Sequence, residues 1–164
     1  MPSTECHNLC FAPVLAPVMT GVIAFKGLSM CVEMDLYNAA VDLIRDRHPQ
    51  GWGGAAAVMT STGRLLTSVA PDTKNDALAL CMDVGAYLEA HKFNEAVTHS
   101  LCIYRDDELS PFKVLTPCGI CQERLVHWGG SVLAAITNVE NKLIFTPVRE
   151  LQPFHWSEVN GGEL

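Results

Sequence analysis

The feature that most constrains this chain is a pair of cysteines, Cys118 and Cys121, preceded by Thr116 and Pro117. Threonine is a common N-cap and proline is favoured at the first helical position, so this run predicts the start of a helix. Two thiols three residues apart at a helix start form one edge of a tetrahedral zinc site. The pair therefore predicts a metal site built on a helix N-terminus.

A third thiol and a carboxylate occur upstream, where Asp83 follows Cys81 by two residues. Three protein ligands leave the fourth zinc position to water, which is the arrangement of catalytic rather than structural zinc sites. Zinc lowers the pKa of its water to roughly 7, and a nearby carboxylate is then needed to move protons. We expect Cys81, Cys118 and Cys121 to bind Zn²⁺ and Asp83 to be catalytic.

The size and charge of the chain limit its partners. A chain of 164 residues that is 49% hydrophobic can bury one core and is too short for two ordinary domains. Binding to nucleic acid requires clustered Lys and Arg, so a net charge of −7 predicts no nucleic-acid partner.

The number of cysteines bears on the cellular compartment, and the apolar segment near the N-terminus bears on membrane insertion. Seven cysteines, an odd number that includes a metal-spaced pair, favour a reducing environment, and we expect a cytoplasmic protein. Residues 9–25 are apolar, but Pro13 and Pro17 interrupt them and they are shorter than a membrane span. We therefore expect no membrane segment.

Apolar periodicity separates an irregular segment, residues 1–29, from one folded domain, residues 30–164. Apolar side chains recur at three and four positions from Val32 and end before His48, which predicts a helix. Two further helices are predicted, one after residues 71–76 and reaching about Lys92, and one from Thr116 to Trp128.

Five strands are predicted, over residues 55–60, 65–70, 97–104, 132–137 and 142–146. The short loops at 61–64 and 138–141 require the strands that they join to be antiparallel. The long connection through the second helix allows the third strand to run parallel to the second. The result is a mixed five-stranded sheet with helices on both faces.

These elements, in this order, resemble the cytidine deaminase family, and especially its blasticidin S deaminase-like branch. The resemblance covers about residues 32–156 and includes Gly54-Ala55-Ala56, Cys81-x-Asp83, the run from Pro117 to Cys121, and Arg149 to Pro153. It implies a three-layer α/β/α sandwich, an α/β fold with zinc on Cys81, Cys118 and Cys121. It also implies hydrolytic deamination of a cytosine ring, with release of ammonia, in a homo-oligomer, either a dimer or, more commonly in the family, a tetramer.

Two positions depart from the family pattern. The family has glutamate where this chain has Asp83, whose side chain is one methylene, or ~1.5 Å, shorter. The family's Asn-x-Glu signature for ribose has no counterpart after Val69, where the chain reads Ala70-Pro71-Asp72. Asp72 is instead a candidate for binding a substrate hydroxyl.

Three functions therefore stay open. The first is a zinc hydrolase that deaminates a small-molecule substrate, cytidine or 2′-deoxycytidine. The second is the same reaction on a cytosine-containing antibiotic such as blasticidin S, which the missing ribose signature motivates. The third is a zinc-containing binding protein without turnover, which the aspartate motivates.

The remaining candidate site residues surround the metal and substrate. Gln122 and Arg124 are expected to donate hydrogen bonds to the metal-bound sulfurs. Pro117 is expected to brace the substrate ring. The aromatic residues Phe154 and Trp156 either cover the chain's own core or complete the pocket of a neighbouring subunit, and are candidate substrate contacts.

Overall fold

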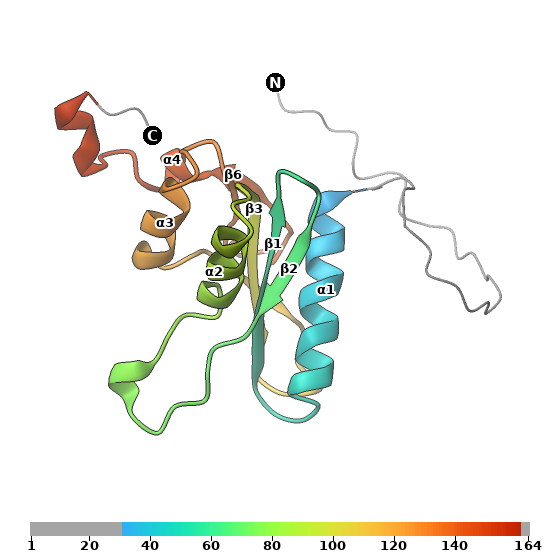
Figure 1. Ribbon diagram of the computed structural model, residues 1–164. Coiled ribbons are helices and arrows are strands. Elements are labelled where there is room, and N and C mark those ends of the chain that lie inside the picture. The colour runs from blue at the N-terminus through green and yellow to red at the C-terminus, as the bar shows by residue number, and fades with distance from the viewer. Residues whose placement is uncertain (1–30, 162–164) are drawn as a thin grey trace, which may run out of the picture.

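Residues 31–161, which a computed structural model describes, fold as three layers with a mixed sheet in the middle (Figure 1). The fold class predicted from the sequence is therefore confirmed, while the predicted segment 1–29 lies outside the described residues. The elements are, in chain order, α1 (Val32–Arg47), β1 (Gly53–Thr60), β2 (Leu65–Ser68), the 3₁₀ turn η1 (Asp76–Leu78), α2 (Val84–Lys92), β3 (Val97–Arg105), β4 (Lys113–Leu115), α3 (Gly119–Val126), β5 (Leu133–Ala135), β6 (Phe145–Pro147), α4 (Val148–Leu151) and η2 (Trp156–Asn160).

The main path of the sheet has the strand order β2-β1-β3-β5-β6. The β1/β2 and β5/β6 pairs are antiparallel, as the short loops predict. Strand β3 pairs antiparallel with β1 and therefore runs in the same direction as β2, as expected, but β1 lies between the two. Strand β5 runs parallel to β3.

Strand β4 was not predicted, because three residues are too few to show a period. It pairs antiparallel with the second half of β3, where Cys102 lies opposite Leu115. The first half of β3, around His99 and Ser100, pairs with β5 instead. Strand β4 therefore leads the chain from the middle of the sheet directly into the cysteine motif that follows Leu115.

Helix α1 covers one face of the sheet, where a four-residue repeat buries Leu36, Ala40 and Ile44 completely. These side chains form a core with alanines of β1 and with Leu101 and Ile103 of β3. The small alanine side chains allow the helix backbone to approach the sheet closely. The helix ends at Arg47, where the pattern predicts it.

Helices α2, α3 and α4 cover the opposite face (Figure 1). Their core side chains include Tyr87 of α2, Leu125 of α3 and Val148 of α4, which cluster with Val58 of β1. Because alternate residues of a strand point to opposite faces, Ala57 belongs to the α1 core and Val58 to this one.

The second helix starts later than predicted. Residues 69–83 form a long loop that extends beyond the sheet (Figure 1), and α2 begins only at Val84. The side chain of Asn75 accepts a hydrogen bond from the Ala77 N–H and caps the single turn η1, after which Ala79 is extended. The early part of the predicted helix was therefore wrong.

The third helix also starts later, since Cys118 and not Thr116 is its N-cap. Thr116 is engaged elsewhere, because its N–H donates to Thr137 Oγ1 at 2.9 Å and its hydroxyl accepts from the Thr137 N–H at 2.8 Å. These two bonds keep the chain extended up to Pro117. The predicted N-cap was wrong by two residues.

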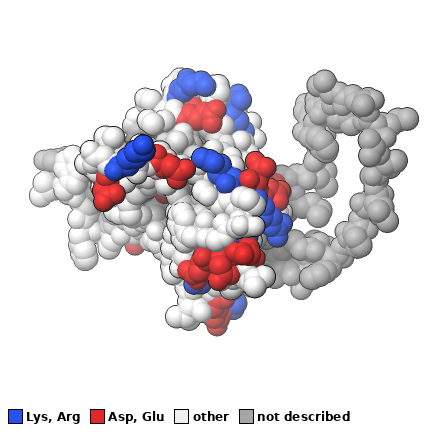
Figure 2. All heavy atoms as spheres, turned by 90° about the horizontal axis from the view of Figure 1, so that it is seen from below, with Lys and Arg blue, Asp and Glu red and all other residues white. Residues whose placement is uncertain are grey.

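The surface of the described residues gives two further observations. On the face in Figure 2, acidic and basic side chains lie next to one another. Within residues 31–161, no helix has both the length and the apolar character needed to cross a membrane.

We expect Leu36→Ala to destabilise the protein by about 2–5 kcal/mol, because Leu36 is 0% exposed between α1 and the sheet. Leu88→Ala is the control, since Leu88 lies on α2 and is 63% exposed. Its effect should stay within about 0.5 kcal/mol. Urea unfolding of both variants measures the difference, and equal losses would contradict the packing of α1 described above.

Candidate active site

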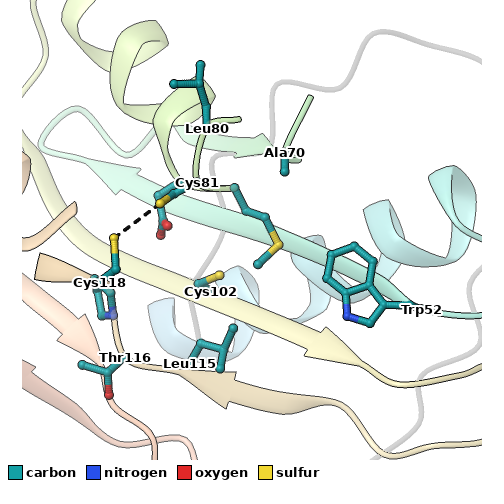
Figure 3. A pocket seen from close by; sticks show the side chains of 11 residues that line it. Trp52, Ala70, Leu80, Cys81, Cys102, Leu115, Thr116 and Cys118 are labelled. Carbon is teal, nitrogen blue, oxygen red and sulfur yellow. Dashed lines mark hydrogen bonds between the residues drawn. The ribbon is translucent and has the colours of Figure 1, made fainter. Parts of the chain in front are cut away.

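Three thiols from two helix starts meet at one end of the sheet. Cys81 precedes α2, Cys118 caps α3 and Cys121 lies in the first turn of α3. Their sulfur atoms all lie within 4.8 Å of one another, and the Cys81 and Cys118 sulfurs are 3.3 Å apart. Figure 3 shows these two side chains pointing toward each other across the gap between their elements.

This spacing fits a zinc ion. Sulfurs at the corners of a tetrahedron, about 2.3 Å from a zinc ion, lie ~3.8 Å apart. The 3.3 Å between the Cys81 and Cys118 sulfurs is near that value, and the whole group lies within 4.8 Å. All three cysteines are free thiols. Cys81, Cys118 and Cys121 are therefore the residues that would hold the ion.

The pKa values of the three thiols bear on how they could hold a cation. Burial, together with the Asp83 carboxylate, raises the pKa of Cys121 far above its ordinary value, and burial also raises the pKa of Cys81. Burial acts in the same sense on Cys118, but backbone N–H groups of Cys121 and Ile120 outweigh it and lower the pKa of that thiol. A divalent cation would supply the positive charge that three thiolates require.

Asp83 lies beside the thiols and is buried, with 3% of its surface exposed. It occupies the N-cap position of α2, but its side chain makes no capping hydrogen bond and instead lines a cavity. Burial raises the pKa of this carboxyl, although hydrogen bonds from its own backbone, Cys121 and Tyr87 act in the opposite direction. A raised pKa suits a group that both takes up and releases a proton near neutral pH.

The cavity in front of the thiols has a volume of about 240 Å³. This is below the ~300–1,000 Å³ of sites for drug-sized ligands and suits a single ring. Its walls are largely apolar, and Figure 3 shows Trp52 at the end opposite Cys118. The lining residues are Trp52, Ala70, Leu80, Cys81, Met82, Asp83, Cys102, Leu115, Thr116, Pro117 and Cys118.

Arg124 and Gln122 were both expected to donate to the sulfurs, but only Arg124 contacts one. The guanidinium of Arg124 lies 3.9 Å from the Cys121 sulfur and is placed to donate to it. The amide of Gln122 donates to the carbonyl of Pro117 at 2.8 Å instead. Gln122 therefore holds the turn that presents Pro117 and Cys118 to the cavity.

Three of the four expected substrate contacts, Asp72, Phe154 and Trp156, are not among the residues that line the cavity. Asp72 is exposed and accepts a hydrogen bond from Arg47 at 3.3 Å. Phe154 is 95% exposed. The indole N–H of Trp156 donates to Glu123 at 3.2 Å. Pro117 does line the cavity.

Several lining residues had not been recognised in the sequence. Cys102 is buried on β3 and also borders the cavity. Trp52, Leu80 and Met82 come from loops whose course depends on tertiary structure. Tyr87 could have been found, since it follows Asp83 by four residues and therefore lies on the same side of α2.

We expect Cys81→Ser to lower the zinc content of the purified protein from one ion per chain to well below one, because two thiols hold zinc more weakly than three. Cys31→Ser is the matched control, since Cys31 lies at the start of α1, outside the group of three thiols, and should leave the zinc content unchanged. Elemental analysis after gel filtration measures both. Full zinc content in Cys81→Ser would contradict the assignment.

Solved structures share this fold and extend the comparison to known proteins. The cytidine deaminase from Bacillus anthracis is 52% identical, with a TM-score of 0.79, over 80% of this chain and 94% of that chain. The cytidine deaminase from Mycobacterium leprae has 20% identity and a TM-score of 0.59, over 75% of this chain and 98% of that chain. The cytidine deaminase from Burkholderia pseudomallei has 16% identity and a TM-score of 0.60, over 77% of this chain and 100% of that chain.

No protein-family model and no curated protein matches the chain. The two more distant structures show the shared fold, whereas the Bacillus anthracis protein matches in sequence along nearly its whole length. On that similarity, the chain belongs to the cytidine deaminase family of hydrolytic deaminases.

Proposed function

We propose that the protein hydrolyses the exocyclic amine of a cytosine nucleoside, cytidine or 2′-deoxycytidine, to a carbonyl and releases ammonia. The observation that carries the proposal is a buried carboxylate, Asp83, beside three convergent thiols, two of which line the same small cavity as Asp83. The 52% identity to a cytidine deaminase supports the choice of a cytosine nucleoside.

Each side chain has a task in this reaction. Cys81, Cys118 and Cys121 would hold the zinc ion, which supplies a water of lowered pKa when bound. Asp83 takes up one proton of the attacking water and delivers it to the ring nitrogen, then takes up the second proton and delivers it to the amine as the carbon–nitrogen bond breaks and the water oxygen becomes the carbonyl. One water is consumed and one ammonia is released, so the carboxylate ends in the state in which it began.

The cavity walls orient the substrate and exclude water. Leu115 and Met82 offer apolar surface to a flat ring, and Trp52 offers an aromatic ring at the far end. The hydrogen bond from Gln122 to Pro117 holds the rim beside the thiols in place. An apolar wall strengthens the few polar contacts that a pyrimidine edge makes.

The end of the cavity distant from the thiols favours a second candidate substrate. Ala70 lines the cavity at the point where the ribose signature is missing, and Asp72 pairs with Arg47 instead of facing inward. A cytosine-containing antibiotic such as blasticidin S is therefore the alternative substrate. The aspartate at position 83 supports the third candidate, a zinc-containing protein without turnover.

We expect the purified zinc protein to release ammonia from cytidine or 2′-deoxycytidine and not from adenosine. Cytosine and blasticidin S complete the panel. Turnover of blasticidin S alone would select the antibiotic as the substrate. Release of ammonia from none of these compounds, at full zinc content, would reject the hydrolytic function and leave the binding protein.

We expect Asp83→Asn to reduce kcat by at least about 100-fold at unchanged zinc content, because an amide cannot carry the proton. Asp46→Asn is the control, since Asp46 lies exposed on α1 and its substitution should leave kcat unchanged. Asp83→Glu adds a methylene to the same carboxylate. An inactive wild type together with an active Asp83→Glu variant would show that the natural protein is a zinc-containing binding protein without turnover.

We also propose that the protein is a cytoplasmic homo-oligomer, either a dimer or a tetramer. The five described cysteines are free thiols, which supports a reducing compartment. Large apolar side chains are exposed on the loop before α2 and near the C-terminus, and apolar groups of this kind favour association. They are Leu78, Leu80, Phe154, Trp156 and Val159.

Sedimentation equilibrium should therefore give two or four times the mass of one chain. Phe154→Ala combined with Trp156→Ala should shift the protein toward monomer, because these residues supply apolar surface for a neighbouring subunit. Leu109→Ala is the control, since Leu109 is also highly exposed but lies on the loop between β3 and β4. A wild-type monomer at all concentrations would contradict the proposal.

A further inference from the structure

The side chain of Asp83 lacks the hydrogen bond that its position on α2 would normally provide. A carboxylate at an N-cap usually accepts from the backbone N–H two or three residues later. Here the backbone of Asp83 is already helical and its side chain makes no capping bond. Three other donors act on this carboxylate: its own backbone N–H, Cys121 and a group further along α2.

Tyr87 supplies that group from one turn further along α2. Its hydroxyl donates to Asp83 Oδ1 at 3.4 Å, and both residues are buried. Residues four apart on a helix lie on the same side, so the contact needs no distortion of α2. The Tyr87 ring packs edge-on against Trp128, with ring centroids 5.9 Å apart, which fixes its direction.

The Tyr87 hydroxyl is itself held by the sheet. Its oxygen lies 2.9 Å from the hydroxyl of Ser100, which is fully buried on the central strand β3. An ionised carboxylate only accepts hydrogen bonds, so Tyr87 donates to Asp83 and Ser100 donates to Tyr87. Burial, and then the Asp83 carboxylate, raise the pKa of Tyr87 well above its ordinary value, so the hydroxyl keeps its proton.

This chain of hydrogen bonds matters because an aspartate has less reach than the family's glutamate. A shorter side chain has its carboxylate close to the helix backbone, where the geometry for proton transfer depends on its rotation. A donor on one oxygen sets that rotation and leaves the other oxygen for proton transfer.

We propose that Tyr87, anchored by Ser100, is a positioning residue that orients the Asp83 carboxylate for proton transfer. The inference rests on the proposed function, since it assigns a task to the acid-base residue of that reaction. It names a residue that acts through Asp83 and does not itself touch the substrate.

Tyr87→Phe tests the inference, because it removes one hydroxyl and keeps the ring that packs on Trp128. We expect kcat for cytidine, or for whichever cytosine compound the wild type deaminates, to fall between about 10-fold and 100-fold. KM should change by less than about 2-fold, since Tyr87 is not among the residues lining the cavity. Zinc content should stay at the wild-type value.

Ser100→Ala gives a second and independent measurement. It should lower kcat less than Tyr87→Phe does, because the phenol keeps its donor to Asp83 but loses its anchor. The double variant should match Tyr87→Phe alone, since Ser100 acts only through the Tyr87 hydroxyl. Additive losses in kcat would instead show two separate structural defects.

Tyr37→Phe is the matched control, because Tyr37 lies half-buried on α1 in the opposite core and its hydroxyl is remote from the site. It should leave kcat and KM unchanged. A kcat for Tyr87→Phe within about 2-fold of the wild type overturns the positioning role. So does a loss accompanied by missing zinc. A wild type that releases no ammonia from the whole panel shows that the proposed function itself has failed, and the inference falls with it.

Discussion

The structure depends on the meeting of three thiols that the chain carries on two separate helix starts. Cys81 arrives from the long loop after β2, and Cys118 and Cys121 arrive from β4. Burial raises the pKa of Cys81 and of Cys121, so three adjacent thiolates would need a cation to offset their charge. A bound zinc ion would therefore stabilise the arrangement of the two helix starts that border the cavity.

Much of this could be predicted from the sequence because the relevant patterns are local. The period of α1, the short loops at 61–64 and 138–141, and the cysteine spacing each depend on neighbours in the chain. The errors occurred where distant contacts decide the structure. Thr116 does not cap α3 because Thr137 binds it, and β4 forms because β3 offers it an edge. The contact between Tyr87 and Ser100 likewise needs a sheet to bring the two together.

The contacts of Asp83 bear on how the shorter side chain at position 83 can work. In isolation, the shorter side chain suggests a weakened enzyme. In the fold, Asp83 is buried, accepts a hydrogen bond from a phenol hydroxyl on one oxygen and lines the cavity. Similar tuning by neighbours allows one type of carboxylate to serve different reactions in many enzymes. The activity that Asp83 supports should therefore depend on Tyr87 and Ser100 as well.

The Thr116–Thr137 pair has a consequence that reaches beyond the start of a helix. Thr137 also donates to the Val114 carbonyl, and Asn141 bonds both Val114 and Phe112, so the turn after β5 is fastened to β4 at several points. Cys118, one of the three cysteines that would hold the ion, follows this segment by only a few positions. The turn after β5 thus restrains the segment that leads into the cysteine pair, so a substitution of Thr137 or Asn141 would act on the candidate metal centre although neither residue lines its cavity.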